Sequence, residues 1–343
     1  MKIAMIAFTK KGAALLERLY DGLCAQGNEV SGFAAASCCE RTKLTPLKGS
    51  VTQWAGQQFV QADAIIFVSA CGIAVRAIAP YVSDKFTDPA VLALDEGAGF
   101  VVPLLSGHIG GANALARAVA GLCGAKAVIS TATDINGVFA ADLWASENNC
   151  VIADRHAAKE LSSALLRGEE IGFFSDFKID GELPLGLVSG KSCKSGVCVS
   201  LDIQKRPFAC TLNLIPRIIT LGIGCRRGTA EEALTAHIKT VLSESNIALC
   251  SVKGVCTVDI KAKEPCILAF CKENALPLLT YSVDELLRVK GEFTASDFVK
   301  SVIGVDNVCE RAAAMGGGKI IVKKQASNGV TAALACDDWS VKF

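Results

Sequence analysis

The chain has 343 residues, of which 51% are hydrophobic and 20% are charged, so it can form two or three domains with substantial buried cores. Lys and Arg (35) almost balance Asp and Glu (34), and the net charge of +1 gives no overall attraction for nucleic acid or an anionic membrane. Apolar runs are strand-sized, far short of the ~20 residues of a spanning helix, and Met1 leads into a strand-like run rather than a secretion signal.

In its first part the chain alternates between apolar β-like runs and amphipathic helical runs, the pattern of a largely parallel sheet covered on both faces. Strands are expected at 3–8, 30–35, 64–68, 91–94, 100–104 and 127–129. Helices are expected at 13–25, 73–78 and 114–121. The sequence therefore predicts an α/β fold that begins with a three-layer α/β/α domain over residues 1–137.

Two further parts are expected after this domain. A smaller middle subdomain, residues 138–215, has a helix at 157–166 and strands at 171–174 and 197–201. A second α/β domain, residues 216–343, has strands at 218–223, 320–323 and 330–334 and helices at 229–242, 263–274 and 283–287. Thr229, with Glu232 three residues later, has the spacing of a capping box that opens the helix at 229–242.

Sixteen cysteines are spread through these predicted strands and helices, which is typical of small buried residues. The closest spacings are an adjacent pair at 38–39, Cys193 with Cys198, and Cys266 with Cys271, and there is no Cys-x-x-Cys. This pattern disfavours an iron–sulfur or zinc site, so we expect no metal held by the protein itself. It also indicates a reducing cytoplasm as the location.

A glycine-rich turn at 106–113 lies between the strand at 100–104 and the next helix, and it holds His108, one of three histidines. Free backbone N–H groups at such a turn attract anions, glycines allow close approach, and a histidine there can exchange protons with the bound group. The candidate binding residues are Ser106, Gly107, Gly110, Gly111 and Asn113. An ordinary tight turn with a solvated histidine is the alternative.

Acidic side chains near this turn offer partners for the histidine. Asp134 follows the strand-like run 127–133, and carboxyl ends of parallel strands are where open α/β sheets build their sites. Asp88 and Asp134 are therefore candidate acids or bases beside His108, although Asp88 before Pro89 is equally a turn residue. The remaining histidines, His156 and His237, are interpreted as solvated helix residues.

Another glycine-rich turn follows the strand at 218–223. Gly222, Gly224 and Gly228 resemble a dinucleotide fingerprint, but their spacing is wrong by one and no clear acid-ended strand follows residue 247. An anion cradle beside Arg226 and Arg227 fits the residues better. In the first domain, Arg76 lies near a helix start just after Gly72 and is a further candidate for a carboxylate contact.

Taken together, several motifs closely resemble the CbiG family of cobalamin biosynthesis. They are Gly72-Ile-Ala-Val-Arg76-Ala-Ile-Ala-Pro80, Asp84-Lys-x-Thr-Asp88-Pro89, Leu104-Leu-Ser-Gly-His108-Ile-Gly-Gly-Ala-Asn113, Thr131-Ala-Thr-Asp134, Leu221-Gly-Ile-Gly-Cys-Arg-Arg-Gly-Thr229 and Gly304-Val-x-x-Val-Cys-Glu310-Arg-Ala-Ala313. The last two, with Gly329-Val-Thr331, resemble a CobE-like C-terminal domain. Arg311 stands where the family pattern usually has a proline.

This resemblance implies a cobalt-precorrin-5A hydrolase of the anaerobic route to vitamin B12. Such an enzyme opens the ring A lactone of its cobalt tetrapyrrole substrate and expels a two-carbon fragment as acetaldehyde, giving cobalt-precorrin-5B. No cofactor is expected, because cobalt arrives within the substrate. Expected partners are this substrate and neighbouring pathway enzymes.

The candidate catalytic residues are His108, Asp88, Asp134 and Glu310. The candidate substrate-binding residues are Gly72, Arg76, Ser106, Gly107, Gly110, Gly111, Asn113, Gly222, Gly224, Cys225, Arg226, Arg227 and Thr229. Two other functions compete with the hydrolase. A non-catalytic tetrapyrrole carrier would bind the same ligand without releasing acetaldehyde, and a nucleotide-dependent oxidoreductase would need the dinucleotide fingerprint that the glycine spacing disfavours.

Overall fold

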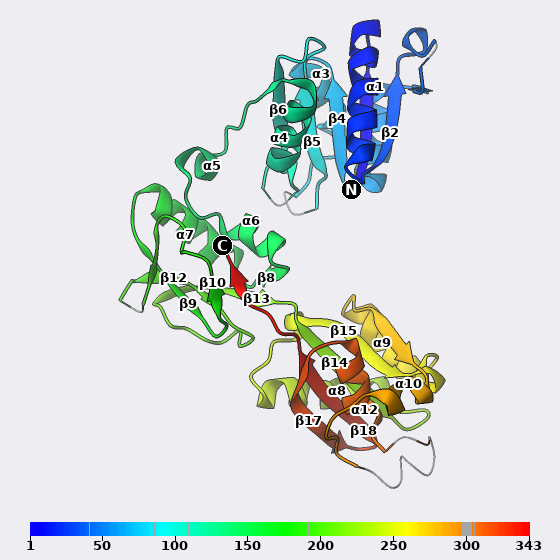
Figure 1. Cartoon of the computed structure of the whole chain (residues 1–343), viewed down its shortest axis with the longest axis vertical. Helices are drawn as coiled ribbons and strands as arrows, with labels where there is room; N and C mark the ends of the chain where they lie inside the picture. The colour runs from blue at the N-terminus through cyan, green and yellow to red at the C-terminus, as the bar shows by residue number, and fades with distance from the viewer. Residues whose placement is uncertain (41, 85–86, 109, 191, 296–303, 305) are drawn as a thin grey trace. The chain divides into compact units, whose positions relative to one another are not determined.

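The computed structural model describes residues 1–343 apart from 41, 85–86, 109, 191, 296–303 and 305 (Figure 1). Contacts divide the chain into two compact units, Met1–Leu143 and Trp144–Phe343, and each is described by itself. Both are mixed α/β structures with largely parallel sheets, which confirms the predicted fold class. In the described part of the chain, no helix combines the length and apolar composition needed to span a bilayer.

The first unit is built on a seven-stranded sheet in the order β3-β2-β1-β4-β5-β6-β7, and only the β5–β6 pair is antiparallel. Its strands are β1 (Lys2–Ala7), β2 (Glu29–Ala34), β3 (Thr45–Pro46), β4 (Ala64–Val68), β5 (Ala90–Leu94), β6 (Phe100–Leu105) and β7 (Lys126–Ala127). Its helices are α1 (Lys10–Ala25), α2 (Val51–Gln61), α3 (Cys71–Ile78), α4 (Ala112–Cys123) and α5 (Ala132–Asn136), followed by α6 (Ala141–Glu147), in which the division between the units falls.

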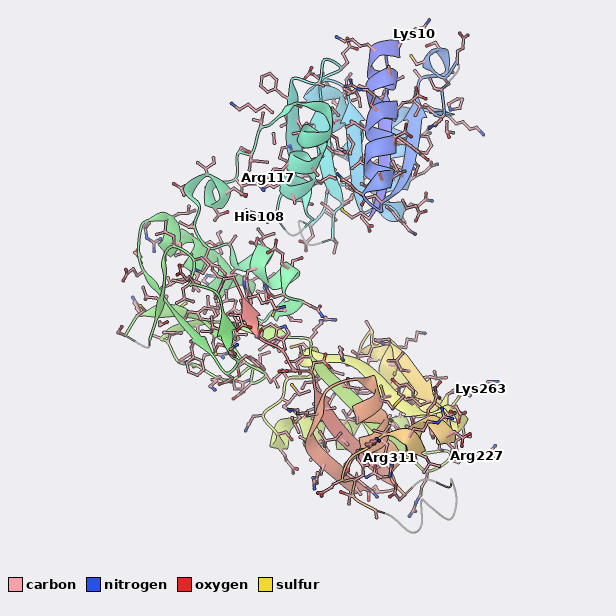
Figure 2. The ribbon with its side chains drawn as sticks, in the orientation of Figure 1. Lys10, His108, Arg117, Arg227, Lys263 and Arg311 are labelled. Carbon is pink, nitrogen blue, oxygen red and sulfur yellow. The ribbon has the colours of Figure 1, made fainter. Side chains whose placement is uncertain are left out.

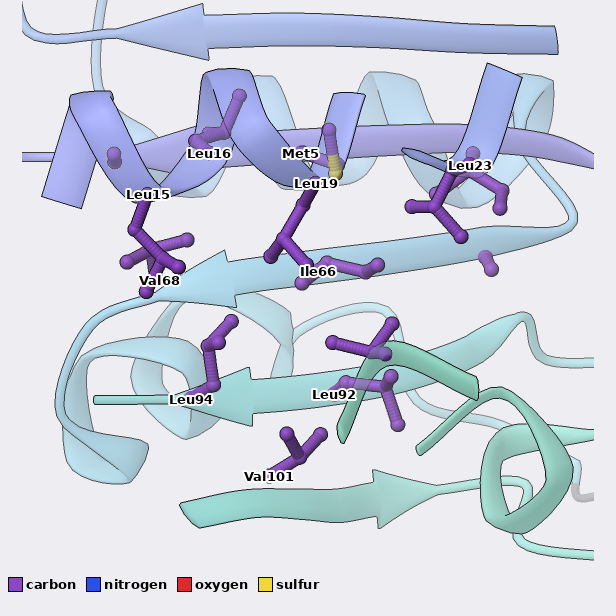
Figure 3. Close-up of a cluster of buried hydrophobic side chains, with 14 of the residues drawn as sticks. Met5, Leu15, Leu16, Leu19, Leu23, Ile66, Val68, Leu92, Leu94 and Val101 are labelled. Carbon is purple, nitrogen blue, oxygen red and sulfur yellow. The ribbon is translucent and has the colours of Figure 1, made fainter. Parts of the chain in front are cut away.

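Strand residues point alternately to the two faces of this sheet, and both faces are buried. Met5 and Ile66 pack with Leu19 of α1 and with α4 on one face, as Figure 3 shows for the strands and α1. Ile6 and Phe67 belong to a second cluster with α2 and α3 on the other face. Continuous apolar strands are therefore required, and the three-layer α/β/α architecture expected from the sequence is confirmed.

One strand is shorter than the sequence predicts, and this changes the setting of Asp134. β7 ends at Ala127, and its pairing with β6 is limited to Phe100 and Val101. The chain then enters α5, whose first turn contains Asp134. The expectation that Asp134 ends a strand is wrong, although the residue stays close to the carboxyl-terminal edge through contacts given below.

The second unit contains two five-stranded sheets, in the orders β11-β9-β12-β13-β8 and β16-β15-β14-β18-β17. The strands are β8 (Cys150–Ile152), β9 (Ile171–Ser175), β10 (Ile179–Asp180), β11 (Leu187–Ser189), β12 (Ser195–Val199), β13 (Cys210–Pro216), β14 (Ile219–Cys225), β15 (Val252–Val258), β16 (Leu278–Tyr281), β17 (Lys319–Ser327), β18 (Val330–Cys336) and β19 (Val341–Lys342). The helices are α7 (Arg155–Leu166), α8 (Glu231–Glu244), α9 (Pro265–Glu273), α10 (Val283–Arg288) and α12 (Val308–Gly316).

The last residues of the chain pack next to the sheet β11-β9-β12-β13-β8. β19 pairs in parallel with the short strand β10, and the Trp144 indole donates a 2.7 Å hydrogen bond to the carbonyl of Lys342. The Phe343 ring contacts the rings of Trp144 and Phe173. Residues at the extreme C-terminus therefore close an aromatic cluster around the middle part of the sequence.

Two local expectations for the C-terminal sheet are wrong. α8 begins at Glu231 with Ala230 as its N-cap and no side-chain cap, because the Thr229 hydroxyl donates to the carbonyl of Arg226 instead. A strand does follow this helix: β15 runs parallel to β14 and is followed directly by Asp259. β15 is not predicted from the sequence because Lys253 and Gly254 interrupt its apolar run.

Candidate functional site

The turn between β6 and α4 is shaped by unusual backbone conformations. Ser106 has φ of 56° and Gly111 has φ of 79°, and a Cβ at Gly110 would lie 2.3 Å from that of Ser106. Glycine is therefore required at 110 and favoured at 111. Gly111, Ala112 and Asn113 donate their amides to carbonyls within the turn. The prediction that the Gly111 amide is free to bind an anion is therefore wrong, because the turn itself uses that donor.

His108 lies in this turn and is joined to α5. Its Nε2 is 2.9 Å from the Thr133 hydroxyl and 3.4 Å from Oδ2 of Asp134. The Asp134 carboxylate also accepts from Asn113 Nδ2 at 2.9 Å and from Arg117 Nη2 at 2.7 Å. The structure thus brings together His108, Asp134 and Asn113, three residues predicted from the sequence to belong to the site, and adds Thr133 and Arg117 (Figure 2 labels His108 and Arg117).

This network assigns different roles to the two nitrogens of His108. The Asp134 side chain is only 12% exposed and faces Nε2, so a neutral imidazole keeps its proton on Nε2 and its lone pair on Nδ1. Nδ1 is buried and has no hydrogen-bond partner among the described residues. Buried polar atoms are usually satisfied. An unpartnered basic nitrogen whose ring is held from the opposite side has the arrangement of a general base.

Asp88 is also near the turn, but its carboxylate is used elsewhere. One oxygen accepts from the Ser83 amide at 2.8 Å and the other from the Ser83 hydroxyl at 2.9 Å. The carbonyl of Asp88 accepts from the buried Ser106 hydroxyl at 2.9 Å. These contacts favour the interpretation of Asp88 as a turn residue. Its carboxylate binds Ser83 and its carbonyl binds Ser106, so it stabilises the turn between β6 and α4 rather than exchanging protons.

Arg76 occupies the last turn of α3 rather than a helix start. Its guanidinium reaches back to donate a 3.2 Å hydrogen bond to the carbonyl of Gly72, and the side chain is exposed. If Arg76 contacts a ligand carboxylate as predicted, that contact is exposed to solvent.

The second unit contains a cavity of about 1100 Å³ where β14 and β15 end. It lies against the N-terminus of α12 and the β17–β18 hairpin. Of the residues predicted to bind substrate, Gly224, Cys225, Arg226 and Arg227 line this cavity, together with Gly228. The other lining residues are Val258, Ile260, Lys261, Lys263, Glu264, Pro265, Asn307, Val308, Cys309, Lys324, Ala326, Ser327, Asn328, Gly329, Val330 and Thr331.

The lining of this cavity is strongly cationic. Five basic side chains face it, and Glu264 is the one acidic residue among the described lining residues. The basic residues are Arg226, Arg227, Lys261, Lys263 and Lys324, and Figure 2 labels Arg227 and Lys263. Glu264 is neutralised locally, because it accepts from Lys261 Nζ at 2.9 Å and from the Gly228 amide at 2.7 Å. The cavity is therefore suited to a ligand with several negative charges.

Two glycines in this region have structural roles: Gly222 allows close packing of a helix, and Gly329 positions Arg226. A Cβ at Gly222 would lie 1.9 Å from the carbonyl of Cys309, so this glycine allows α12 to approach β14. Gly329 has φ of 79°, its carbonyl accepts from the Arg226 amide, and its missing Cβ leaves room for the Arg226 side chain. Gly222 and Thr229 are not among the lining residues, and the glycine pattern is explained by packing.

Glu310 is completely buried in the first turn of α12. Oε1 accepts from the Lys324 amide at 2.7 Å and Oε2 from the Thr294 amide at 2.9 Å. Burial alone would raise the pKa of this carboxyl, but these backbone hydrogen bonds outweigh it and hold the pKa below its ordinary value. Both oxygens are thus committed to the backbone, which indicates that Glu310 joins α12 to β17 rather than exchanging protons.

The fold and the sites define this chain as a multi-domain α/β protein with a histidine turn in one unit and a cationic small-molecule cavity in the other. Comparisons with known proteins identify the family to which such a chain belongs. Family models described as Cobalamin synthesis G N-terminal, Cobalamin biosynthesis central region and Cobalamin synthesis G C-terminus match residues 53–134, 139–216 and 219–335.

Three relatives cover different extents of the chain. The cobalt-precorrin-5A hydrolase of Salmonella typhimurium is 32% identical over 97% of both chains. That of Priestia megaterium is 29% identical over 95% of this chain and 92% of the relative. Protein CobE of Sinorhizobium sp is 33% identical over 34% of this chain and 79% of its own length. The chain belongs to the CbiG family and is a hydrolase-class enzyme of cobalamin biosynthesis with a CobE-like C-terminal part.

Proposed function

We propose that this chain hydrolyses the ring A lactone of cobalt-precorrin-5A and releases acetaldehyde, giving cobalt-precorrin-5B. The observation that carries the assignment is the His108 ring, which is fixed through Nε2 by Asp134 and Thr133 while Nδ1 has no partner among the described residues. Relatives named as cobalt-precorrin-5A hydrolases support the choice of substrate. Cobalt belongs to the substrate, and the net reaction adds water, so no redox cofactor is required.

His108 starts the proposed reaction by accepting a proton from water at Nδ1. The hydroxide adds to the lactone carbonyl, the ester C–O bond breaks, and the acetate side chain of ring A is left as a carboxylic acid, which releases its proton to solvent and becomes a carboxylate. Positive charge that develops on the imidazole is stabilised by Asp134 next to Nε2. Because Nδ1 is covered by protein atoms, the turn has to shift before this nitrogen contacts water.

Loss of the two-carbon fragment follows lactone opening. The released oxygen, on the meso carbon, forms the aldehyde C=O as the carbon–carbon bond to the macrocycle breaks. The electron pair of that bond stays on the macrocycle, which takes up a proton from the His108 imidazolium. Water is therefore consumed, acetaldehyde leaves and the base is regenerated.

The cationic cavity of the second unit has a different proposed role. Acetate and propionate groups surround a precorrin, and Arg226, Arg227, Lys263 and Lys324 offer charge-assisted hydrogen bonds to them. The cavity volume of about 1100 Å³ is at the upper end of ordinary ligand sites, as a macrocycle requires. We propose that these residues contribute affinity and do not take part in bond cleavage.

An anaerobic turnover assay tests the proposal. The full chain is incubated with cobalt-precorrin-5A, and acetaldehyde is measured by coupled reduction to ethanol with loss of NADH absorbance. We expect one acetaldehyde for each cobalt-precorrin-5B formed. A protein that binds the tetrapyrrole stoichiometrically but produces no acetaldehyde would be a carrier, and the hydrolase assignment would then be wrong.

A further inference from the structure

Two cysteine thiols and a carboxylate meet in the wall of the cationic cavity. The Cys225 and Cys266 sulfurs are 3.9 Å apart, and a carboxylate oxygen of Glu264 lies within 4.8 Å of both. Cys225 is the last residue of β14, Glu264 is the N-cap of α9, and Cys266 is in the first turn of that helix. The strand end and the helix start therefore place three potential metal ligands around one point.

The spacing of these atoms suits a tetrahedral ion. Two sulfurs bound at about 2.3 Å in tetrahedral geometry lie roughly 3.8 Å apart, which is close to the observed 3.9 Å. A rotation of the Glu264 side chain that brings its carboxylate closer to the two sulfurs would provide the third ligand of the ion. Cys225 and Glu264 both line the cavity, so the fourth position of such an ion faces the space that a ligand would occupy.

Charges around the three ligands are arranged to support this coordination. Two thiolates and a carboxylate around a divalent ion carry a net charge of −1, and Lys261 and Arg227 lie nearby to compensate it. Each oxygen of Glu264 has one present partner, Gly228 or Lys261, and retains a second lone pair for a metal.

We propose that Cys225, Cys266 and Glu264 form a binding site for a thiophilic divalent cation such as Zn²⁺ or Co²⁺. Binding converts both thiols to metal-bound thiolates and releases two protons to solvent. Three protein ligands and one position open to the cavity define a site that can take water or a ligand carboxylate. This inference departs from the expectation of no protein-held metal, and it rests on these three side chains alone, independently of the proposed reaction.

Titration with Co²⁺ alone tests this site, because thiolate-bound Co²⁺ gives sulfur-to-metal charge-transfer absorption. The full chain is freed of metal by a chelator, reduced and titrated under anaerobic conditions. We expect one equivalent of Co²⁺ to produce the band and Zn²⁺ to displace it. Cys225→Ser and Cys266→Ser should each lower the affinity by more than about tenfold, whereas Cys271→Ser, a buried thiol of α9 outside the cluster, should keep the band.

Circular dichroism verifies that each variant is folded, and Cys225→Ser decides the result if Cys266→Ser does not fold. The inference is overturned if wild-type protein gives no thiolate band, or if a folded Cys225→Ser or Cys266→Ser variant binds Co²⁺ with wild-type affinity and gives an unchanged band. Acetaldehyde release plays no part in this readout. A wrong metal site and a wrong reaction assignment can therefore be told apart.

Discussion

The histidine turn and the cationic cavity differ in which of their polar groups are not already paired within the protein. At the turn, the one described cation beside Asp134 is Arg117, which is already paired with that carboxylate, while Nδ1 of His108 has no partner within the described part of the chain. In the cavity, Glu264, the one acid among the described lining residues, is paired with Lys261, while several basic side chains face open space. The first region is equipped for proton transfer and the second for binding anions.

This contrast suggests that substitutions in the two regions will have different kinetic signatures. Loss of a group that acts only in the transition state lowers kcat, whereas loss of a contact made equally to substrate and transition state raises KM. Variants of the turn should therefore change kcat, and variants of the cavity should change affinity. Substitutions of His108, Arg226, Glu310 and Arg76 test this division.

His108→Ala should lower the rate of acetaldehyde release by about 10²- to 10⁴-fold, because it removes the proposed general base. Affinity for the tetrapyrrole, measured by fluorescence quenching, should stay within about twofold if the base adds no ground-state binding. His156→Ala, which alters an exposed histidine of α7, is the matched control and should keep wild-type turnover. A folded His108→Ala protein with normal turnover would show that the turn has no catalytic role.

Arg226→Ala should act on binding instead. A hydrogen bond to a charged group contributes about 1.5–3 kcal/mol, so Kd should rise by roughly 10- to 150-fold with little change in kcat. The loss should shrink as salt is added, because the cavity is open to ions. Lys239→Ala, on the exposed side of α8 and outside the cavity lining, is the control for a general loss of positive charge. Equal affinities of Arg226→Ala and wild type would place the carboxylates elsewhere.

Glu310→Gln separates a structural carboxylate from a catalytic one. The amide keeps the shape, but its NH2 group cannot accept from a backbone amide, so one of the two hydrogen bonds is lost and the other loses its charge. The second unit should therefore lose about 1–3 kcal/mol of unfolding free energy. Since the folded pKa is below the ordinary value, this stabilisation is complete above about pH 4.3 and is lost as pH falls through the folded pKa. Urea unfolding at pH 7 and at acid pH should show the difference shrinking. A large drop in kcat without loss of stability would instead indicate that Glu310 has a catalytic role, as the sequence predicts.

Local sequence patterns were sufficient for much of the fold. Buried parallel strands such as β4 are continuous apolar runs, and their ends were placed to within about a residue. α2 was missed because its four glutamines and one glycine weaken the apolar pattern. The capping box of Ser50 and Gln53 is a local signal that could have revealed it. α12 is also marked locally, since Asn307 caps the amide of Glu310 three residues later.

The sites depended more on long-range folding. His108 and Asp134 were paired in advance because both follow strands of one sheet, but nothing in the sequence separates a free carboxylate from one already paired, such as that of Asp88. The cavity lysines could not be predicted, because Lys263 and Lys324 come from segments about 40 and 100 residues after the arginine turn. Lys263 is brought there by the parallel β14–β15 pairing, and Lys324 by the antiparallel β14–β18 and β18–β17 pairings, which join distant parts of the chain.

Arg76→Ala should have the smallest effect of the four. The guanidinium is exposed and already bonded to the Gly72 carbonyl of its own helix, so any contact to a ligand carboxylate is weakened by water and salt. We expect Kd to rise by less than about fivefold, with kcat and thermal stability unchanged. Arg18→Ala, an arginine on α1, is the control, and both variants are measured at low and high salt. A rise in Kd as large as that of Arg226→Ala would mean that the first unit also binds the substrate carboxylates, and the division between a proton-transfer region and an anion-binding region would then have to be abandoned.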